Sequence, residues 1–91
     1  MKTSTKVAFN KWAQLKKDHA DRILLFSLGN YYETYGKDAE ILSNVLLHTD
    51  RCTMGSEGKV FGFRASEIND VLTSLIKAGY KAGVCEFNEF I

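Results

Sequence analysis

Several features are scarce in this 91-residue sequence, and each scarcity excludes a class of protein. There is no proline, so no proline-rich linker or obvious hinge is expected. The two cysteines, Cys52 and Cys85, lack C-x-x-C spacing, which argues against a zinc site or a redox pair. No apolar run approaches the roughly 18 residues of a membrane span, and residues 1–9 lack the apolar centre of a secretory signal. A cytoplasmic protein without a membrane partner is expected.

Neither sign of charge predominates in the whole chain, whose net charge is only +1. Its distribution is uneven. Residues 1–22 carry six basic and two acidic side chains, a net charge of +4, whereas the remaining residues sum to −3. A basic helix in the first segment could lie along a phosphate backbone, and a solvated helix face is the alternative reading of the same charges.

The composition that remains, 45% hydrophobic and 25% charged residues, is typical of one small globular domain spanning residues 1–91. Apolar spacing predicts helices over 5–19, 38–48 and 66–78 and strands over 23–28, 31–35, 59–64 and 81–87. Asp38 and Ser66 are the expected N-caps of the later helices. The segment 51–58 is expected to be an exposed, mobile loop, and Cys85 to lie in a buried strand. The expected fold is α/β, with a small mixed sheet flanked by helices.

The helix expected over 66–78 has the clearest pattern in the chain. Its apolar residues follow i, i+3, i+4, i+7, i+8 spacing and are expected to face the core: Ile68, Val71, Leu72, Leu75 and Ile76. Gly79 is expected to end this helix.

The most informative stretch is Gly29–Tyr35, which reads G-N-Y-Y-E-T-Y after the apolar segment 23–28. In an extended strand, Tyr31 and Glu33 would project to the same side, about 7 Å apart. One side chain could then stack on a flat ring while the other hydrogen-bonds to the edge of that ring, an arrangement that suits an unstacked nucleobase. Tyr32 would point to the opposite side and support the fold. The competing interpretation is an ordinary strand with one packed and one solvated face.

This stretch resembles the signature G-D-F-Y-E of the N-terminal, mismatch-recognising domain of the MutS family. Four further segments, in the same order and spacing, extend the resemblance from about Phe9 to Phe87. Trp12–Lys17 and Ile23–Phe26 are similar to the opening helix and the L-L-L-F strand of the family. Gly36–Glu40 is similar to G-E-D-A-E, and Gly79–Glu86 to G-Y-K-V-A-I-C-E.

The resemblance implies a MutS domain I fold and contact with mismatched or distorted double-stranded DNA. It implies that Tyr31 wedges into the DNA at the mispair and that Glu33 contacts the mispaired base. Basic residues expected to add DNA contacts are Lys16, Lys17, Arg51 and Arg64. The sequence also departs from the family, with tyrosine for phenylalanine at Tyr31 and Phe61–Glu67 in place of A-G-V-P-Y-H-A. The connector, lever, clamp and ATPase domains of MutS have no counterpart here, so no ATPase activity, cofactor, metal or catalytic residue is expected.

Two other functions compete with DNA recognition. Asp50, Glu57 and Lys59 have the D…E-x-K outline of metal-dependent nucleases, although the acids fall in or beside a glycine-containing loop. The stronger rival is a non-catalytic protein-interaction or regulatory module that retains the fold. Such a module would bind another repair protein or a second copy of itself through Trp12, Phe87 and Phe90.

Overall fold

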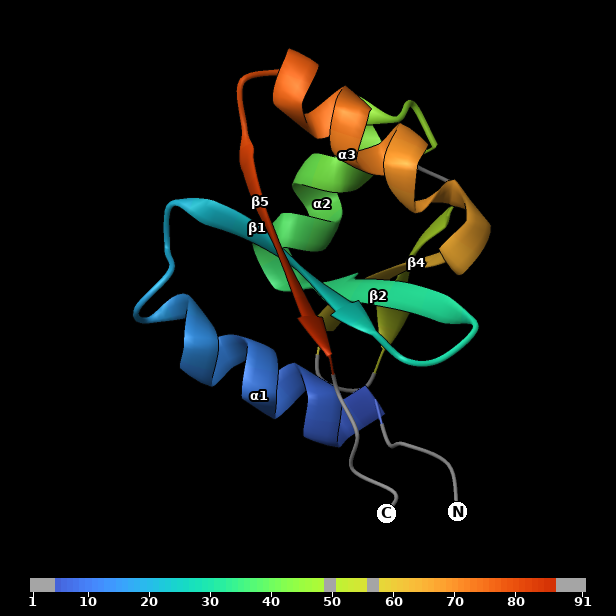
Figure 1. The fold of residues 1–91 in the computed structure, drawn as a ribbon. Coiled ribbons are helices and arrows are strands. Elements are labelled where there is room, and N and C mark those ends of the chain that lie inside the picture. Colours follow the sequence, from blue (N-terminus) through green and yellow to red (C-terminus); the bar gives the residue numbers. More distant parts are fainter. Residues whose placement is uncertain (1–4, 49–50, 56–57, 87–91) are drawn as a thin grey trace.

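A five-stranded mixed β-sheet runs through the centre of the computed structural model, which describes residues 5–48, 51–55 and 58–86 (Figure 1). Within these residues the strand order is β3-β4-β2-β1-β5. β1 pairs in parallel with β5, and the other neighbours are antiparallel. The strands are β1 Arg22–Ser27, β2 Tyr31–Tyr35, β3 Cys52–Gly55, β4 Gly58–Arg64 and β5 Lys81–Glu86. The expected α/β fold with a small mixed sheet is therefore confirmed.

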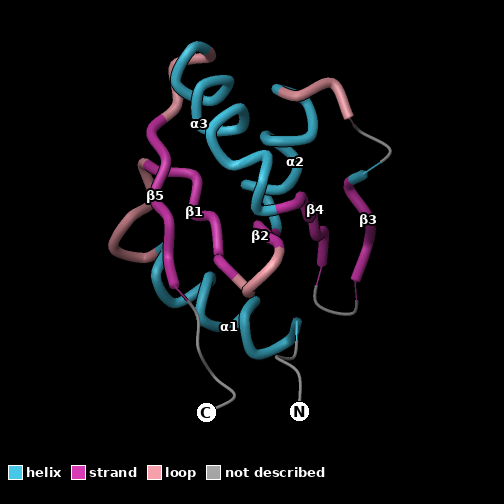
Figure 2. The backbone as a smooth tube through the Cα atoms, turned by 45° about the vertical axis from the view of Figure 1, so that its right-hand side comes forward, coloured by secondary structure: helices cyan, strands magenta, loops and turns pink. Residues whose placement is uncertain are grey.

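Helices cover both faces of this sheet. α1 (Thr5–Lys16) lies against one face, and α2 (Gly36–Val45) and α3 (Ile68–Lys77) lie against the other. Figure 1 and Figure 2 show this arrangement from two directions. A 3-10 turn, η2 (Ala65–Glu67), leads from β4 into α3. No helix in the described ranges is long and apolar enough to cross a membrane.

The strand β1 shows why the sheet needs helices on both faces. Its residues alternate between two hydrophobic clusters: Ile23 and Leu25 face the α2 and α3 side, and Leu24 and Phe26 face the α1 side. All four side chains are at most 3% exposed. A strand buried on both faces reads as a continuous apolar run, so the buried strand expected over residues 23–28 is confirmed, although it spans Arg22–Ser27 and is fully buried only over Ile23–Phe26.

Asp38 does not cap α2, contrary to the sequence expectation. The helix begins two residues earlier, at Gly36, without a side-chain cap. Asp38 is buried and accepts hydrogen bonds from Trp12 Nε1 at 2.9 Å, Lys16 Nζ at 3.0 Å and the Leu24 backbone N–H at 3.2 Å. Its carboxylate therefore ties α1 and β1 to the first turn of α2, which is a tertiary role.

Gly36 is required by two independent features of this junction. Its φ of +57° lies in the left-handed region that favours glycine. A Cβ at this position would also stand 2.7 Å from Cη2 of Trp12. The chain can thus turn from β2 into α2 directly beneath the indole ring only because this residue has no side chain.

The segment expected to be a loop, 51–58, contains the edge strand β3. It pairs antiparallel with β4, with Cys52 opposite Phe61 and Thr53 opposite Val60. The strand is short and its two central residues are exposed, so it has no alternating apolar pattern for sequence analysis to detect. Residues 56 and 57 lie outside the described part.

The ends of the helices also differ from those expected from the sequence. α1 ends at Lys16 and α2 at Val45, three residues before the expected ends. Ser66 lies in η2, and neither η2 nor α3 has a side-chain N-cap. Gly79, with φ +91°, does end α3 as expected.

Two apolar positions are more exposed than expected. Val71 and Leu75 of α3 are buried, and Ile68 and Leu72 pack against the same cluster, but Ile76 is 66% exposed. Cys85 is only partly buried, because β5 is an edge strand rather than an interior one. The expected strand end at Phe87 falls outside the described residues; β5 is described to Glu86.

Candidate nucleic-acid interface

The alternation of side chains along β2 separates a candidate site from the core. Tyr32 stacks on Phe63, with ring centroids 5.3 Å apart and an interplanar angle of 7°, and packs against the cluster under α2 and α3. Thr34 is buried and its Oγ1 donates to the Leu24 carbonyl at 2.8 Å. Successive strand side chains point to opposite faces, so Tyr31 and Glu33 lie together on the α1 side. The sequence predicted that these two side chains share one side, opposite Tyr32.

The hairpin that leads into β2 leaves Tyr31 accessible. Gly29 has φ +94°, which permits the tight turn, and the Leu28 N–H donates to the Tyr31 carbonyl at 2.9 Å. The carbonyl of Asn30 accepts from the Ala65 N–H at 3.0 Å, which ties the hairpin to the end of β4. Tyr31 is 43% exposed on this anchored hairpin. The ring of Tyr31 is therefore available to a ligand, while these two hydrogen bonds hold the backbone of the hairpin.

Arg64 is the basic residue that the sheet brings to this site. It stands directly opposite Tyr31 in the β2–β4 pairing and is exposed. Gly62 stands opposite Glu33, so β4 places no side chain beside the carboxylate. The site therefore consists of a ring, a carboxylate and a guanidinium on two neighbouring strands.

The carboxyl group of Glu33 is electrostatically unusual for a surface acid. Partial burial raises its pKa above the ordinary 4.5, while a hydrogen bond from the Tyr35 hydroxyl to Oε1, at 2.8 Å, opposes this rise. Burial, and then the Glu33 charge, also raise the pKa of Tyr31. A protonated carboxyl can donate as well as accept a hydrogen bond, so a raised pKa widens the set of base edges that Glu33 can bind.

The other basic residues predicted to contact DNA lie elsewhere. Lys16 Nζ pairs with the buried Asp38 and donates to the Arg22 carbonyl, at the start of β1. Tyr31 follows the other end of β1, and the two ends of this strand are about 17 Å apart by the usual rise per residue. Lys17 is exposed just beyond the end of α1.

Arg51 lies on the opposite side of the sheet from Tyr31. Its guanidinium is 3.5 Å from Glu67 and 5.8 Å from the centroid of Phe61, a ring of the cluster under α2 and α3. The structure thus brings together Tyr31, Glu33 and Arg64, but not Lys16, Lys17 or Arg51.

Tyr35 is a member of the site that was not predicted from the sequence. The spacing i, i+2 that paired Tyr31 with Glu33 also pairs Glu33 with Tyr35, so the signal was present. Trp12, which the alternative protein-interaction hypothesis placed at an interface, is partly buried, packs in the cluster under α1 and donates to Asp38. Phe87 and Phe90 lie outside the described residues.

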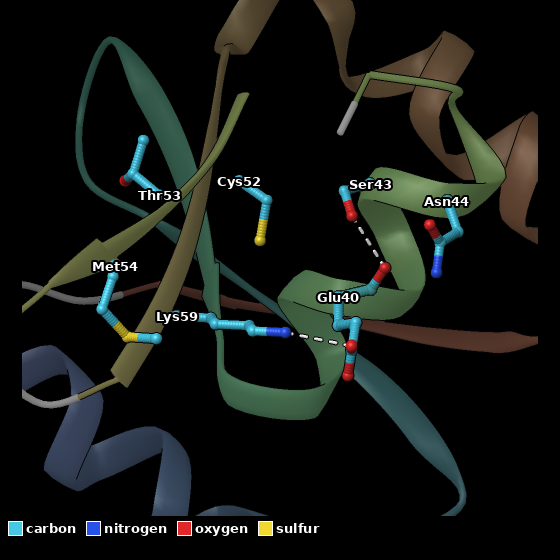
Figure 3. A pocket seen from close by; sticks show the side chains of 7 residues that line it. All are labelled: Glu40, Ser43, Asn44, Cys52, Thr53, Met54 and Lys59. Carbon is cyan, nitrogen blue, oxygen red and sulfur yellow. Dashed lines mark hydrogen bonds and ion pairs between the residues drawn. The ribbon is translucent and has the colours of Figure 1, made fainter. Parts of the chain in front are cut away.

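Away from this site, a hollow lies on the α2 side of the sheet, between that helix and strands β3 and β4 (Figure 3). Its volume is about 260 Å³, and Lys59 crosses it to pair with Glu40 at 3.0 Å. Lys59 belongs to the nuclease-like outline, but Asp50 and Glu57 lie outside the described residues. Among the residues that are described, no group of three or more His, Cys, Asp or Glu could hold a metal ion.

The fold and the site together define a class of protein: a small α/β domain that presents an aromatic ring and a carboxylate side by side on one strand of a mixed sheet. The chain belongs to the MutS domain I family, whose model matches residues 6–90. This match confirms the family resemblance that the sequence motifs indicated.

Individual relatives agree with the family match. The chain is 34% identical to the DNA mismatch repair protein MutS of Thermotoga petrophila over 76 residues, covering 84% of this chain and 9% of that protein. It is 31% identical to the protein of the same name from Methanococcoides burtonii, covering 87% of this chain and 9% of the relative. The Christiangramia forsetii protein is 33% identical, covering 93% and 10%. The chain thus spans about a tenth of the length of these relatives.

Proposed function

We propose that this domain contacts mismatched or distorted duplex DNA through Tyr31, Glu33 and Arg64. The observation that carries the proposal is the pairing of an exposed ring with a half-buried carboxylate on the same face of β2. The relatives named as mismatch repair proteins support duplex DNA as the ligand.

Each of the three side chains has a distinct task in this proposal. Tyr31, held on the anchored hairpin, enters the stack at a weakened base step, where unstacking costs least. Arg64, opposite Tyr31, contacts a phosphate beside the inserted ring. Glu33 meets the edge of the displaced base, and its partial burial limits competition from water for that hydrogen bond.

The carboxylate distinguishes this site from a general DNA-binding surface. An ionised Glu33 repels phosphates, so it weakens contact with ordinary duplex DNA and has value only where a base edge comes within reach. We therefore expect Glu33 to contribute selectivity, and Tyr31 and Arg64 to contribute affinity. No residue is assigned a catalytic role.

Titration of the protein into fluorescently labelled duplexes, followed by anisotropy at low salt, tests the proposal. Homoduplex, single-mismatch and single-base-bulge DNA of the same length should be compared. With one arginine at the site, we expect dissociation constants in the range of about 10⁻⁴ to 10⁻⁶ M that weaken as salt increases. Equal affinity for all three duplexes would refute mismatch recognition, and an absence of binding at low salt would favour the protein-interaction module instead.

The variant Glu33→Ala sharpens this test. Removing the charge relieves phosphate repulsion, so homoduplex affinity should hold or increase, whereas the preference for mismatched DNA should shrink. Glu67→Ala is a matched control, because Glu67 is a similarly half-exposed glutamate whose partner, Arg51, lies on the other side of the sheet. A loss of homoduplex binding in Glu33→Ala would show that the carboxylate supports the surface rather than selects the ligand.

A further inference from the structure

The side chain of Tyr35 is held rigidly beneath the proposed site. It is 0% exposed, and its ring packs against three other rings: Phe9 at 5.8 Å, Phe26 at 6.0 Å and Trp12 at 6.3 Å between centroids. These contacts come from both α1 and β1, so the ring cannot move without disturbing two elements. Its hydroxyl is therefore a fixed point from which a neighbouring group can be oriented.

That hydroxyl donates a hydrogen bond to Oε1 of Glu33, at 2.8 Å. Within the described ranges, no protein donor is recorded for Oε2. We propose that Tyr35 is a positioning residue for Glu33: its hydroxyl holds Oε1 toward the domain, which leaves Oε2 as the oxygen that meets a displaced base. This inference rests on the function proposed above and adds a determinant of its selectivity.

The same hydrogen bond determines which oxygen carries the proton when Glu33 is neutral. Oε1 already accepts the Tyr35 hydroxyl proton, so an added proton resides on Oε2, where it can be donated to a ligand. Tyr35 itself stays protonated, because burial and the neighbouring Glu33 raise the pKa of its phenol far above the ordinary value. Glu33 thus presents either an acceptor or a donor through Oε2, depending on pH.

The surroundings of Glu33 contain few other groups that could set its protonation. Its cross-strand neighbours are the uncharged Phe26 on β1 and Gly62 on β4, and α1 contributes Phe9 and Trp12 around the Tyr35 ring. The titratable or charged groups nearby are Tyr31 and Tyr35 on β2, Arg64 opposite Tyr31, Cys85 opposite Phe26, and Lys11 beside Cys85. Of these, Tyr35 alone hydrogen-bonds Glu33 among the described residues.

The variant Tyr35→Phe tests the proposal, because it removes the hydroxyl and keeps the buried ring. The pKa of Glu33 should be measured in the free protein by ¹³C NMR of the side-chain carboxyl, with Glu33→Gln used to assign the signal. The hydroxyl hydrogen bond lowers this pKa, so it should rise in Tyr35→Phe. Tyr32→Phe is the matched control: it removes a hydroxyl on the opposite face and should leave the Glu33 pKa unchanged.

DNA binding supplies the second readout. Tyr35→Phe should reduce the ratio of mismatch to homoduplex affinity by about two- to ten-fold, the effect expected from one hydrogen bond. In a Glu33→Ala background, the same substitution should have no further effect on this ratio. An equal loss in both backgrounds would mean that Tyr35 acts through the general structure, and would overturn the positioning role.

The two readouts keep this inference distinguishable from the proposed function. An unchanged Glu33 pKa in Tyr35→Phe overturns the positioning role even if the wild type prefers mismatched DNA. If the wild-type protein binds no DNA, the proposed function is overturned, and a DNA base can then no longer be the group that Oε2 of Glu33 binds. If Tyr35→Phe does not fold, ¹H NMR of the Tyr35 hydroxyl proton decides the coupling: its resonance should shift in Glu33→Gln, which replaces the charged acceptor by a neutral one, and no change overturns the inference.

Discussion

Tyr31 and Tyr32 are adjacent, chemically identical side chains on opposite faces of one strand, and they provide a stringent test of the proposed site. Truncating Tyr31 to alanine should weaken DNA binding with little effect on stability. Truncating Tyr32 should do the reverse. The comparison is internally controlled, because both substitutions remove the same atoms from neighbouring positions of β2.

The magnitudes follow from the surroundings of each ring. Tyr31 is 43% exposed, and its cross-strand neighbour on β4 is Arg64, a type of contact that contributes about 0.2–1 kcal/mol. Tyr32 stacks in parallel on Phe63 and packs against the core, so its loss combines a stacking contribution of about 0.5–1.5 kcal/mol with lost burial. Because Tyr32 is only partly buried, we expect about 3 kcal/mol, the low end for truncating a buried aromatic.

Binding should respond in the opposite order. An aromatic ring stacked on a base contributes about 1–3 kcal/mol, so Tyr31→Ala should raise the dissociation constant for mismatched DNA about 5- to 150-fold. Tyr32→Ala should leave it within about three-fold under conditions where the protein stays folded. Tyr80→Ala is the control for an exposed tyrosine, because Tyr80 is 39% exposed and lies between α3 and β5.

Urea unfolding followed by the fluorescence of the single tryptophan, and anisotropy with labelled mismatch DNA, measure the two effects separately. The reasoning is refuted if Tyr31→Ala destabilises the domain by more than about 2 kcal/mol, well beyond the usual effect at an exposed position. It is also refuted if Tyr80→Ala weakens DNA binding as much as Tyr31→Ala, because the ring would then act through general surface contact.

Three further predictions concern stability. Leu75→Ala, at a fully buried position of α3, should cost about 2–5 kcal/mol, whereas Ile76→Ala, 66% exposed, should stay within about 0.5 kcal/mol by urea unfolding. Asp38→Ala should cost about 3–5 kcal/mol, because it leaves Lys16, the buried Leu24 N–H and the partly buried Trp12 indole N–H without their acceptor. Asp70→Ala, at an exposed position in the first turn of α3, should cost less than about 1 kcal/mol. The raised pKa of Glu33 implies stabilisation that is complete below its ordinary value of 4.5 and is lost as pH rises through the higher folded-state value. The unfolding free energy of the wild type relative to Glu33→Gln should therefore decrease over that pH range, and a difference independent of pH would contradict the raised pKa.

Local patterns in the sequence predicted the elements whose burial is periodic. The run in β1 and the stripe in α3 each reflect burial that recurs within one element, so the neighbouring residues alone reveal it. β3 has no such pattern, because its central residues are exposed and it pairs with β4 through backbone groups, which every residue type has. Ile76 fits the helical stripe by spacing and is nevertheless 66% exposed, because spacing within a helix does not specify how much of its face neighbouring elements cover.

Asp38 shows a different reason for failure. Its place near the start of an apolar helical pattern is the usual signature of an N-cap. The groups that bind it, on Trp12, Lys16 and Leu24, are 14 to 26 residues away in the sequence. A rule that considers only adjacent residues cannot anticipate such long-range partners, whereas the Tyr35–Glu33 contact spans two residues and could have been found.

The three alternate residues of the site on β2 differ in how strongly the fold restrains them. Tyr35 is fully buried and fixed by rings from α1 and β1, Glu33 is half-buried and tied to it, and Tyr31 is exposed on a hairpin. Restraint therefore decreases from the core toward the ligand. A wedge must adapt to differently distorted base steps, so an exposed ring suits Tyr31. A hydrogen bond that distinguishes base edges requires a fixed direction, so the restrained carboxyl suits Glu33. Substitutions toward Tyr35 should consequently affect selectivity, and substitutions toward Tyr31 should affect affinity.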